Sequence, residues 1–466
     1  MIERQPEATG WLETLAKQLK EEFHLPAVWL AINHEDRLET AVLGVHKYGE
    51  SAPASLEDKL TIASISKPMA GFWIASLVDR GMLTYETRVL EILPELSAIC
   101  LPEHREITLA QLLTHTAGVI RDVKQLPSNL RLDQYPQERL NQAREVLSSP
   151  APENSKGKSV YSNNGMTLAA TMAERVVREP YETAGGRFYR ERLGLRSWGV
   201  WPMSLPEDIS VPWPHELNNN VPVPRSPRSV AFQFVRPSGS VHCTISDLVR
   251  FGLIATNATD ASRSLLKPET WARLTEPSLG SSTTLCSFST GPKTVYGHGG
   301  SLGTTRSTLS LIADWRVAFA VHTNANSEKF TEVALRRMQD AFRQRRAKRA
   351  PVASCAIYLT EVTTVGETWK ISVEPKRTDE KIRIRVRFHI EARRQTGDLQ
   401  TIVKLGDVER VDNRFTGLVP GDHVLHFEFD TPKTTQTPVF IQLDALETAN
   451  NRTTRPKIFK SVLSLP

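Results

Sequence analysis

The chain of 466 residues has 40% hydrophobic residues and a formal net charge of +6 at pH 7. This length and hydrophobic content exclude a disordered chain and favour two domains with a sizeable core. The first residues contain no apolar run of signal-peptide length, and no later segment reaches the roughly 18 uninterrupted apolar residues of a membrane span. We therefore expect a soluble, cytoplasmic protein.

Helical and extended patterns alternate at the start of the chain. GWLETLAKQLKEEF (10–23) has apolar residues at helical spacing and predicts a helix. PAVWLAINHEDRLETAVLGV (26–45) predicts two strands joined by a turn around His34 to Asp36. SKPMAGFWIASLVDRGML (66–83) predicts a buried helix that stops at Gly81, a residue favoured just past a helix end.

Strands return near residue 307 and are followed by a helix. STLSLIADWRVAFAVHTNA (307–325) predicts paired strands around Ala313 to Trp315, and TEVALRRMQDAFRQRR (331–346) predicts a helix. Helices and strands from the two ends of this region can pack as one layered α/β unit. We therefore expect the middle, about residues 65 to 240, to be a helical and loop-rich insertion in a first domain over residues 1–345.

The pattern changes after residue 350. KIRIRVRFHIEA (381–392) alternates apolar and polar residues, which is typical of a half-buried strand. Further short apolar runs are separated by Gly, Pro and Asp turn signals. They predict a small all-β domain, sandwich-like or barrel-like, over residues 350–466.

The excess positive charge lies in one short run. Seven cations stand between Arg336 and Arg349 against one acid, Asp340, which accounts for the net charge of the whole chain. Such a run can bind phosphates or acidic lipid. At the end of a helix a solvated terminal turn that complements the helix dipole is the favoured interpretation. We expect no nucleic-acid partner.

The cysteines do not predict a metal site. They are far apart and form neither a CxxC pair nor a pattern with an adjacent histidine: Cys100, Cys243, Cys286 and Cys355. Neither a zinc site nor a disulfide framework is indicated, and buried free thiols are expected.

TIASISKPMAGFW (61–73) places Ser64 and Lys67 three residues apart at the start of the predicted buried helix. Their side chains share a helix face, and a partly desolvated lysine can accept the proton of a serine hydroxyl that is otherwise a poor nucleophile. Pro68 has no N–H to bond the Ser64 carbonyl, so the first turn is expected to be tightened or irregular. An N-cap serine beside a surface lysine is the structural alternative. A second Ser-x-x-Lys match, Ser155 and Lys158, is interpreted as a plain loop.

Three further stretches complete an ordered set of motifs. They are ITLAQLLTHTAGV (107–119), SVYSNNGMTLAATMAERVV (159–177) before a helix, and VYGHGGSLGTTRSTLSL (295–311) before a strand. Together with Ser64 and Lys67 they resemble the serine β-lactamase and penicillin-binding protein superfamily. The likeness is to its class C-like branch of β-lactamases, DD-peptidases, D-aminopeptidases and esterases. It covers about residues 10–345 and implies an antiparallel sheet flanked by helices.

The resemblance implies catalytic roles for four residues. Ser64 would be the acylated nucleophile, Lys67 its proton-handling partner, and Tyr161 the second member of the general-base pair. Asn163 would orient Lys67 and the substrate amide. No metal and no organic cofactor are implied. Without the motif context, Tyr161 is a half-buried aromatic residue and Asn163 an N-cap.

The third motif would lie on an edge strand that borders the site. His298 holds the place that lysine usually takes, and Gly299 and Gly300 would let the substrate backbone approach closely. The backbone N–H groups of Ser64 and Ser301 would form the oxyanion hole. Without the motif, His298 is a turn residue beside two glycines.

Two other features are assigned structural roles. His115, in LTHTAG, packs beside the site in the family segment and is expected to perform no chemistry. The segment VPWPHELNNNVPVPRSP (211–227), with Trp213 and His215, is interpreted as a loop that walls the pocket.

These residues predict a serine hydrolase that forms an acyl-enzyme on an ester, amide or lactam of a small-molecule or peptide-like substrate. Lysine is permanently charged and holds a carboxylate, whereas histidine is mostly neutral at pH 7, so His298 favours uncharged esters. The alternatives are a true β-lactamase or DD-peptidase, and a catalytically silent binding or scaffold protein on the same fold. The sequence leaves the oligomeric state open.

Overall fold

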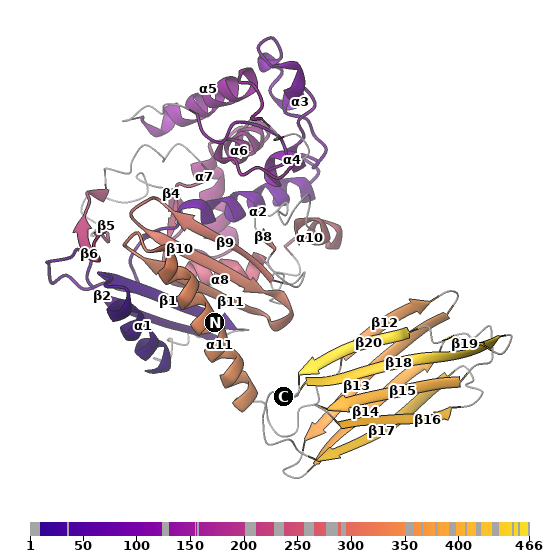
Figure 1. Ribbon diagram of the computed structural model, residues 1–466. Helices are drawn as coiled ribbons and strands as arrows, with labels where there is room; N and C mark the ends of the chain where they lie inside the picture. Colours follow the sequence, from indigo (N-terminus) through magenta and orange to yellow (C-terminus); the bar gives the residue numbers. More distant parts are fainter. Residues whose placement is uncertain are drawn as a thin grey trace. The chain divides into compact units, whose positions relative to one another are not determined.

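The protein is described by a computed structural model (Figure 1). The described residues are 10–34, 37–123, 130–153, 155, 158–200, 211–227, 237–255, 265–275, 288–289 and 295–349, together with the strands between Tyr358 and Ser464. The chain divides into two compact units, Met1–Gln339 and Asp340–Pro466. In the described part of the chain, no helix is both long enough and apolar enough to cross a membrane.

An antiparallel sheet forms the centre of the first unit (Figure 1). Its strand order is β2-β1-β11-β10-β9-β8. The bounds are β1 Ala27–His34, β2 Arg37–Gly44, β8 Phe288–Ser289, β9 Val295–Ser301, β10 Arg306–Ile312 and β11 Val317–Thr323. β1 pairs with β11, so segments almost 300 residues apart in sequence lie side by side at the middle of the sheet. The predicted hairpin at 26–45 and the predicted strand pair at 307–325 are both confirmed.

Helices cover both faces of this sheet. α1 (Gly10–Glu22) packs on β1 and β2, and α11 (Glu328–Arg349) joins it on the same face, where Gln339 contacts Ser310. α8 (Ile245–Ala255) packs on the opposite face, where Gly252 lies against Leu311 and Ala318. The predicted helices at 10–23 and 331–346 are confirmed, as is the expectation of an antiparallel sheet flanked by helices.

The middle of the chain is the predicted helical insertion. Its larger helices are α2 Ser66–Asp79, α3 Val89–Ile92, α4 Leu109–Leu113, α5 Tyr135–Ser148, α6 Asn163–Val177 and α7 Tyr181–Gly186, and α10 Pro268–Thr275 follows later. Short helical turns are η1 Ala63–Ile65, η2 Pro94–Leu96, η3 Pro102–His104, η4 Leu132–Gln134, η5 Arg187–Arg192 and η7 Ala313–Trp315. Short strands are β3 Leu60–Thr61, β4 Gly199–Val200, β5 His215–Asn218, β6 Val221–Pro224 and β7 Val241–Cys243.

α2 lies at the centre of this insertion. Every residue from Ser66 to Leu77 is buried, so the helix is surrounded by protein on all sides. The helix ends at Asp79, and Gly81 follows with a φ of +72°, the left-handed conformation that glycine adopts without strain. The predicted buried helix and its stop at Gly81 are confirmed.

Strands also occupy the described part of the second unit. They are β12 Tyr358–Thr364, β13 Glu367–Arg377, β14 Lys381–Ile390, β15 Asp398–Leu405, β16 Val408–Phe415, β17 Gly421–Asp430, β18 Pro438–Ala449, β19 Arg452–Thr454 and β20 Lys457–Ser464. One sheet has the order β12-β13-β14-β17, and the other β16-β15-β18-β19 with β20 paired to β18. The domain boundaries set out above stay a prediction.

A buried arginine joins three helices of the insertion. Arg139 on α5 has no exposed surface and donates hydrogen bonds to Glu174 on α6 and Glu182 on α7. Both carboxylates are at least nine-tenths buried. Because charges lose their hydration on burial, this cation and its two anions depend on one another.

The Arg139 cluster therefore predicts a large effect of one substitution. Arg139→Met should lower the free energy of unfolding by about 3–5 kcal/mol, because it leaves two buried carboxylates without their cation. The matched control is Arg131→Met, whose arginine pairs with Asp133 at 2.6 Å but is 76% exposed, so stability should hardly change. Urea denaturation followed by circular dichroism measures both, and equal effects would contradict the prediction.

Candidate active site

Ser64 lies in a tight turn directly before the central helix. The turn is η1, Ala63–Ile65, which leads directly into α2 at Ser66, so Ser64 lies at the start of the buried helix as predicted. Ala63 has a φ of +50°, a left-handed conformation that is uncommon for a residue with a side chain. Pro68 provides no N–H for the Ser64 carbonyl, which is consistent with the tightened turn.

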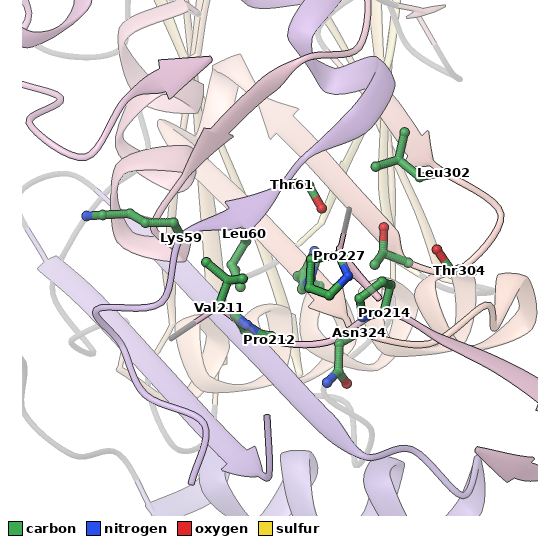
Figure 2. A pocket seen from close by; sticks show the side chains of 12 residues that line it. Lys59, Leu60, Thr61, Val211, Pro212, Pro214, Pro227, Leu302, Thr304 and Asn324 are labelled. Atoms are coloured by element: carbon green, nitrogen blue, oxygen red, sulfur yellow. The ribbon is translucent and has the colours of Figure 1, made fainter. Parts of the chain in front are cut away.

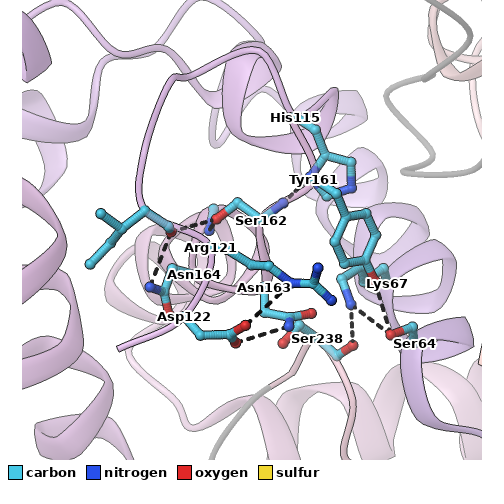
Figure 3. A network of polar contacts seen from close by, with 12 residues as sticks. Ser64, Lys67, His115, Arg121, Asp122, Tyr161, Ser162, Asn163, Asn164 and Ser238 are labelled. Atoms are coloured by element: carbon cyan, nitrogen blue, oxygen red, sulfur yellow. Dashed lines mark hydrogen bonds and ion pairs between the residues drawn. The ribbon is translucent and has the colours of Figure 1, made fainter. Parts of the chain in front are cut away.

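Lys67 and Tyr161 both reach the Ser64 hydroxyl. Lys67 Nζ donates to Ser64 Oγ at 3.1 Å, and Tyr161 Oη lies 2.9 Å from the same oxygen. Figure 3 shows these contacts converging on Ser64. Tyr161 comes from the residues just before α6, 97 positions along the chain. The structure thus brings together three of the residues that the sequence singled out.

The ammonium group of Lys67 is held in the interior of the protein. The Lys67 side chain has no exposed surface, and Nζ also donates to the backbone carbonyl of Ser238 at 2.8 Å. The same nitrogen lies 4.8 Å from the centre of the Tyr161 ring. A buried cation needs such partners, because it has lost its hydration.

The segment before α6 is anchored to the loop at 120–122. Ser162, the N-cap of α6, accepts a hydrogen bond from Gly165 N and donates to the Ile120 carbonyl. The N-cap is therefore Ser162, and the alternative that Asn163 caps the helix is wrong. Asn163 Nδ2 donates to Asp122 Oδ1 at 2.9 Å. The predicted role of Asn163 toward Lys67 stays a prediction.

Two buried histidines stand beside Tyr161. The ring centres of His115 and His298 lie 4.7 Å and 6.2 Å from that of Tyr161. Burial, followed by the nearby charge of Lys67, lowers the pKa of both imidazoles to about 3. Both rings are therefore neutral at pH 7.

Hydrogen bonds assign the protons of these two rings. His298 Nδ1 lies 2.6 Å from the Gly299 carbonyl, which can only accept, so Nδ1 carries the proton. His115 Nδ1 accepts from the backbone N–H of Ser162 at 3.3 Å, so its proton is on Nε2. His115 supports the backbone next to Tyr161, in line with the structural role predicted for it.

The two adjacent glycines that follow His298 on β9 differ in their surroundings. A Cβ at Gly300 would lie 2.1 Å from the backbone oxygen of Ile62, whereas a Cβ at Gly299 would meet no described atom within 4 Å. Gly300 thus makes room for the chain's own backbone, and the expected approach of the substrate backbone to Gly299 and Gly300 stays a prediction. Because Ile62 precedes Ser64 by two residues, this contact brings Ser301 and the edge of β9 up to the nucleophile turn.

Sequence reasoning missed several residues around Ser64. Ser238 acts through its backbone carbonyl, for which no residue type is diagnostic. Arg121, whose backbone carbonyl accepts from the N–H groups of Asn163 and Asn164, places its guanidinium carbon 5.5 Å from the centre of the Tyr161 ring. Asp122 pairs with Arg121 at 3.4 Å. The motif ITLAQLLTHTAGV ends just before these two residues, and their polar character was the available signal.

The remaining candidates are not part of this cluster. His215 is fully buried, with its ring nitrogens bonded to the Asn324 carbonyl and the Tyr48 N–H, and is structural. Pro212 and Pro214, which precede it in the same loop, line a pocket (Figure 2). In the second Ser-x-x-Lys match, Ser155 is buried while Lys158 is exposed, so the two form no pair of the Ser64 kind.

Comparison with known proteins identifies the family. Residues 12–342 match the family described as Beta-lactamase, which is more than half of the chain. The protein therefore belongs to the β-lactamase family, and the resemblance predicted from the four motifs is confirmed.

Solved structures share the fold. A class C β-lactamase from Rhodobacter sphaeroides is 16% identical with a TM-score of 0.57, and the match covers 72% of this chain and 100% of that one. A D-amino acid amidase from Ochrobactrum anthropi SV3 is 15% identical with a TM-score of 0.59, over 72% of this chain and 99% of that one. Identities this low establish a common fold and leave the substrate open.

A curated relative matches over a shorter region. "Penicillin-binding protein 4" of Amycolatopsis lactamdurans is 29% identical over 104 residues, which are 22% of this chain and 27% of the relative. The chain thus spans about a quarter of the length of this relative.

The different surroundings of Gly299 and Gly300 predict different effects on stability when each is replaced by alanine. Gly300→Ala should lower the free energy of unfolding by about 1–3 kcal/mol, because the new Cβ collides with the Ile62 carbonyl. Gly299→Ala, its matched control, adds the same methyl group where no described atom stands within 4 Å and should keep the stability of the native protein. Thermal unfolding compares the two, and a Gly300→Ala protein of native stability would refute the close contact.

Proposed function

We propose that the protein is a serine hydrolase that forms an acyl-enzyme at Ser64 on uncharged ester substrates. The observation that carries this proposal is the position of Ser64 Oγ within 3.1 Å of Lys67 Nζ and 2.9 Å of Tyr161 Oη. A serine hydroxyl becomes a useful nucleophile when an adjacent base accepts its proton. Membership of the β-lactamase family supports the same chemistry.

The proposed reaction has two halves. Ser64 Oγ attacks the carbonyl carbon of the substrate while its proton passes to Tyr161, which acts as the phenolate beside the Lys67 ammonium group. The bond between the carbonyl carbon and the leaving oxygen then breaks, and Tyr161 returns the proton to the leaving alkoxide. Water next attacks the acyl carbon by the same route, which releases a carboxylic acid and restores the Ser64 hydroxyl.

The developing negative charge requires donors on the other side of Ser64. In the proposal these are the backbone N–H groups of Ser64 and Ser301. The contact between Gly300 and Ile62 supports this role, because it holds the β9 edge next to the nucleophile turn. Each such donor typically stabilises the transition state by about 3 kcal/mol.

The neutral state of His298 supports uncharged substrates. A histidine with a pKa of about 3 carries no charge at pH 7 and cannot replace a lysine as the partner of a carboxylate. Gly299 remains the glycine of β9 with room for the substrate backbone. The alternatives are a β-lactamase or DD-peptidase, which need carboxylate recognition, and a silent scaffold, which needs no ordered proton-transfer pair.

We further propose that residues 350–466 form a small all-β domain that contributes no catalytic residue. The strands from β12 to β20 support an all-β character for this segment. All residues assigned to catalysis lie between Ser64 and Ser301. The basic run at 336–349 lies on α11, where Arg343 pairs with Asp340, in line with a solvated helix end.

A covalent probe tests the nucleophile. An activated phosphonate should label the native protein once, and Ser64→Ala should abolish the adduct, because the attacking oxygen is gone. Ser155→Ala is the matched control and should be labelled normally. Lys67→Ala and Tyr161→Phe should each slow labelling by at least roughly 100-fold, the typical effect of losing an acid–base group. Intact mass spectrometry reads out each adduct.

Two results of this experiment would be decisive against the proposal. An adduct that survives in Ser64→Ala would assign the nucleophile elsewhere. Absence of any adduct in the native protein, with its fold intact, would favour the silent scaffold.

The pH dependence of ester hydrolysis tests the charge of His298. Since its pKa is about 3, the imidazole stays neutral from pH 5.5 to 9, and nitrophenyl ester hydrolysis should show no titration of this residue near pH 6.5. His298→Gln, which also keeps the position neutral, should retain the shape of the profile. His298→Lys should shift preference toward carboxylate-bearing β-lactams.

Hydrolysis of a chromogenic cephalosporin, a substrate that carries a carboxylate, tests the alternative that the protein is a β-lactamase. Efficient turnover by the native protein at pH 8 would reject the ester preference and favour a β-lactamase. Turnover of acidic substrates that falls as pH rises through about 6.5 would mean that His298 acts as a cation.

A further inference from the structure

A pocket lies next to the segment that leads into the nucleophile turn, because Leu60 and Thr61 line it. Its lining comes from β3, the segment 211–227, the turn between β9 and β10, and the end of β11 (Figure 2). Much of the wall is apolar: Leu60, Val211, Pro212, Pro214, Pro227 and Leu302. Prolines have few conformations to lose, so such a wall is shaped before any ligand arrives.

The pocket is nearly free of charge. Lys59 is the one lysine in the described lining, which contains no arginine, aspartate or glutamate, and Figure 2 shows its side chain extending away from the other lining groups. His322 is neutral, because burial lowers its pKa to about 3. Asn324 already accepts from Ala27 N and donates to the His46 carbonyl. A charged ligand would find no compensating partner here.

Two threonines supply the unused polar groups of the pocket. Thr304 and Thr305 line it and are 7% and 5% exposed. Neither hydroxyl has a hydrogen-bond partner in the described part of the chain. Because buried polar groups are almost always hydrogen-bonded, two adjacent exceptions in one pocket point to a ligand that completes them.

Two of the segments that line the pocket continue directly into the proposed reacting centre. Thr61, in the lining, precedes Ser64 by three residues, and Leu302 directly follows Ser301. Lys67 and Tyr161, which would return the proton to the leaving group, come from α2 and the segment before α6, and these segments do not line the pocket. In the proposed reaction the leaving group faces Tyr161, and the pocket, which Tyr161 and Lys67 do not line, is the candidate site for the acyl group.

We propose that this pocket binds the acyl group of the substrate and selects an uncharged, mostly apolar acyl chain with an oxygen that accepts a hydrogen bond from Thr304 or Thr305. The inference rests on the proposed acyl-enzyme function and adds the class of acyl group. An ether or carbonyl oxygen within the chain meets the requirement, whereas a terminal carboxylate does not.

Matched nitrophenyl esters test this selection. The 3-methoxypropanoate and pentanoate esters differ by one oxygen in place of a CH2 group and share a leaving group. After correction for their rates with hydroxide, the native protein should favour the methoxy ester in kcat/KM by roughly 3- to 10-fold, the range of one net hydrogen bond. The hemisuccinate ester, which carries a carboxylate, should be the poorest of the three.

Threonine-to-valine variants locate the effect. Thr304→Val, Thr305→Val and the double variant remove hydroxyls at nearly constant shape, and the double variant should abolish the preference for the methoxy ester. Its thermal stability should equal or exceed that of the native protein, because no intramolecular hydrogen bond is lost. Thr331→Val is the control: this equally buried threonine on α11 donates to the Glu328 carbonyl, and its replacement should leave the preference unchanged.

The outcomes separate this inference from the proposed function. Nitrophenyl acetate, whose acyl group has no chain oxygen to accept from the threonines, should give a Ser64-dependent burst in the native protein and in the double valine variant. The burst could be present while the native protein shows no preference for the methoxy ester, or while the double variant keeps that preference. In either case the acyl-group assignment is wrong and the proposed hydrolase function is retained. If the native protein gives no burst, the proposed function fails and this inference with it.

Discussion

The buried ammonium group of Lys67 is the constraint on which the arrangement of the site depends. It lies in the interior, on a helix surrounded by protein, with the Ser64 hydroxyl and the Ser238 carbonyl as acceptors and the Tyr161 ring nearby. An isolated charge in such a place would be very unfavourable, so these partners must be held in position. The same contacts that stabilise the charge keep the ammonium group beside Ser64 and Tyr161, where it would favour the phenolate form of Tyr161 as the acceptor of the Ser64 proton.

The charge of Lys67 also sets the state of its surroundings. His115 and His298 are buried near it, and both have pKa values lowered to about 3 by burial and by this cation. These two rings add no charge to that of Lys67, and Arg121 is the further cation near Tyr161. β9 itself has hydrogen-bonding groups for a substrate but no lysine or arginine, which agrees with an uncharged substrate and with the nearly uncharged pocket that Leu302 lines.

The two sides of the site belong to different parts of the fold. Lys67 and Tyr161 come from the helical insertion, whereas His298 and Ser301 come from the edge of the central sheet. The contact of Gly300 with the Ile62 carbonyl joins them, because any side chain at this position would push β9 away from the nucleophile turn. The glycine is thereby as important for the geometry of the site as the residues that would perform chemistry.

By itself, the sequence determined the helix at 10–22, the hairpin at 27–44, the paired strands at 306–323 and the grouping of Ser64, Lys67 and Tyr161. The helix, the strands and the Ser64–Lys67 pair leave local signals, namely apolar periodicity, turn residues and side chains of distinctive chemistry at short spacing. Tyr161, 97 residues from Ser64, was joined to that pair by the family resemblance of the motifs. Only the tertiary structure decided that Ser238 would support Lys67, that Gly300 would face Ile62, and that Ser162 would cap α6. The first two are contacts with a backbone carbonyl far away in sequence, and the choice between neighbouring cap residues depends on the loop at 120–122. Because a backbone carbonyl is the same in every residue type, the sequence carries no record of which one a buried lysine will bind.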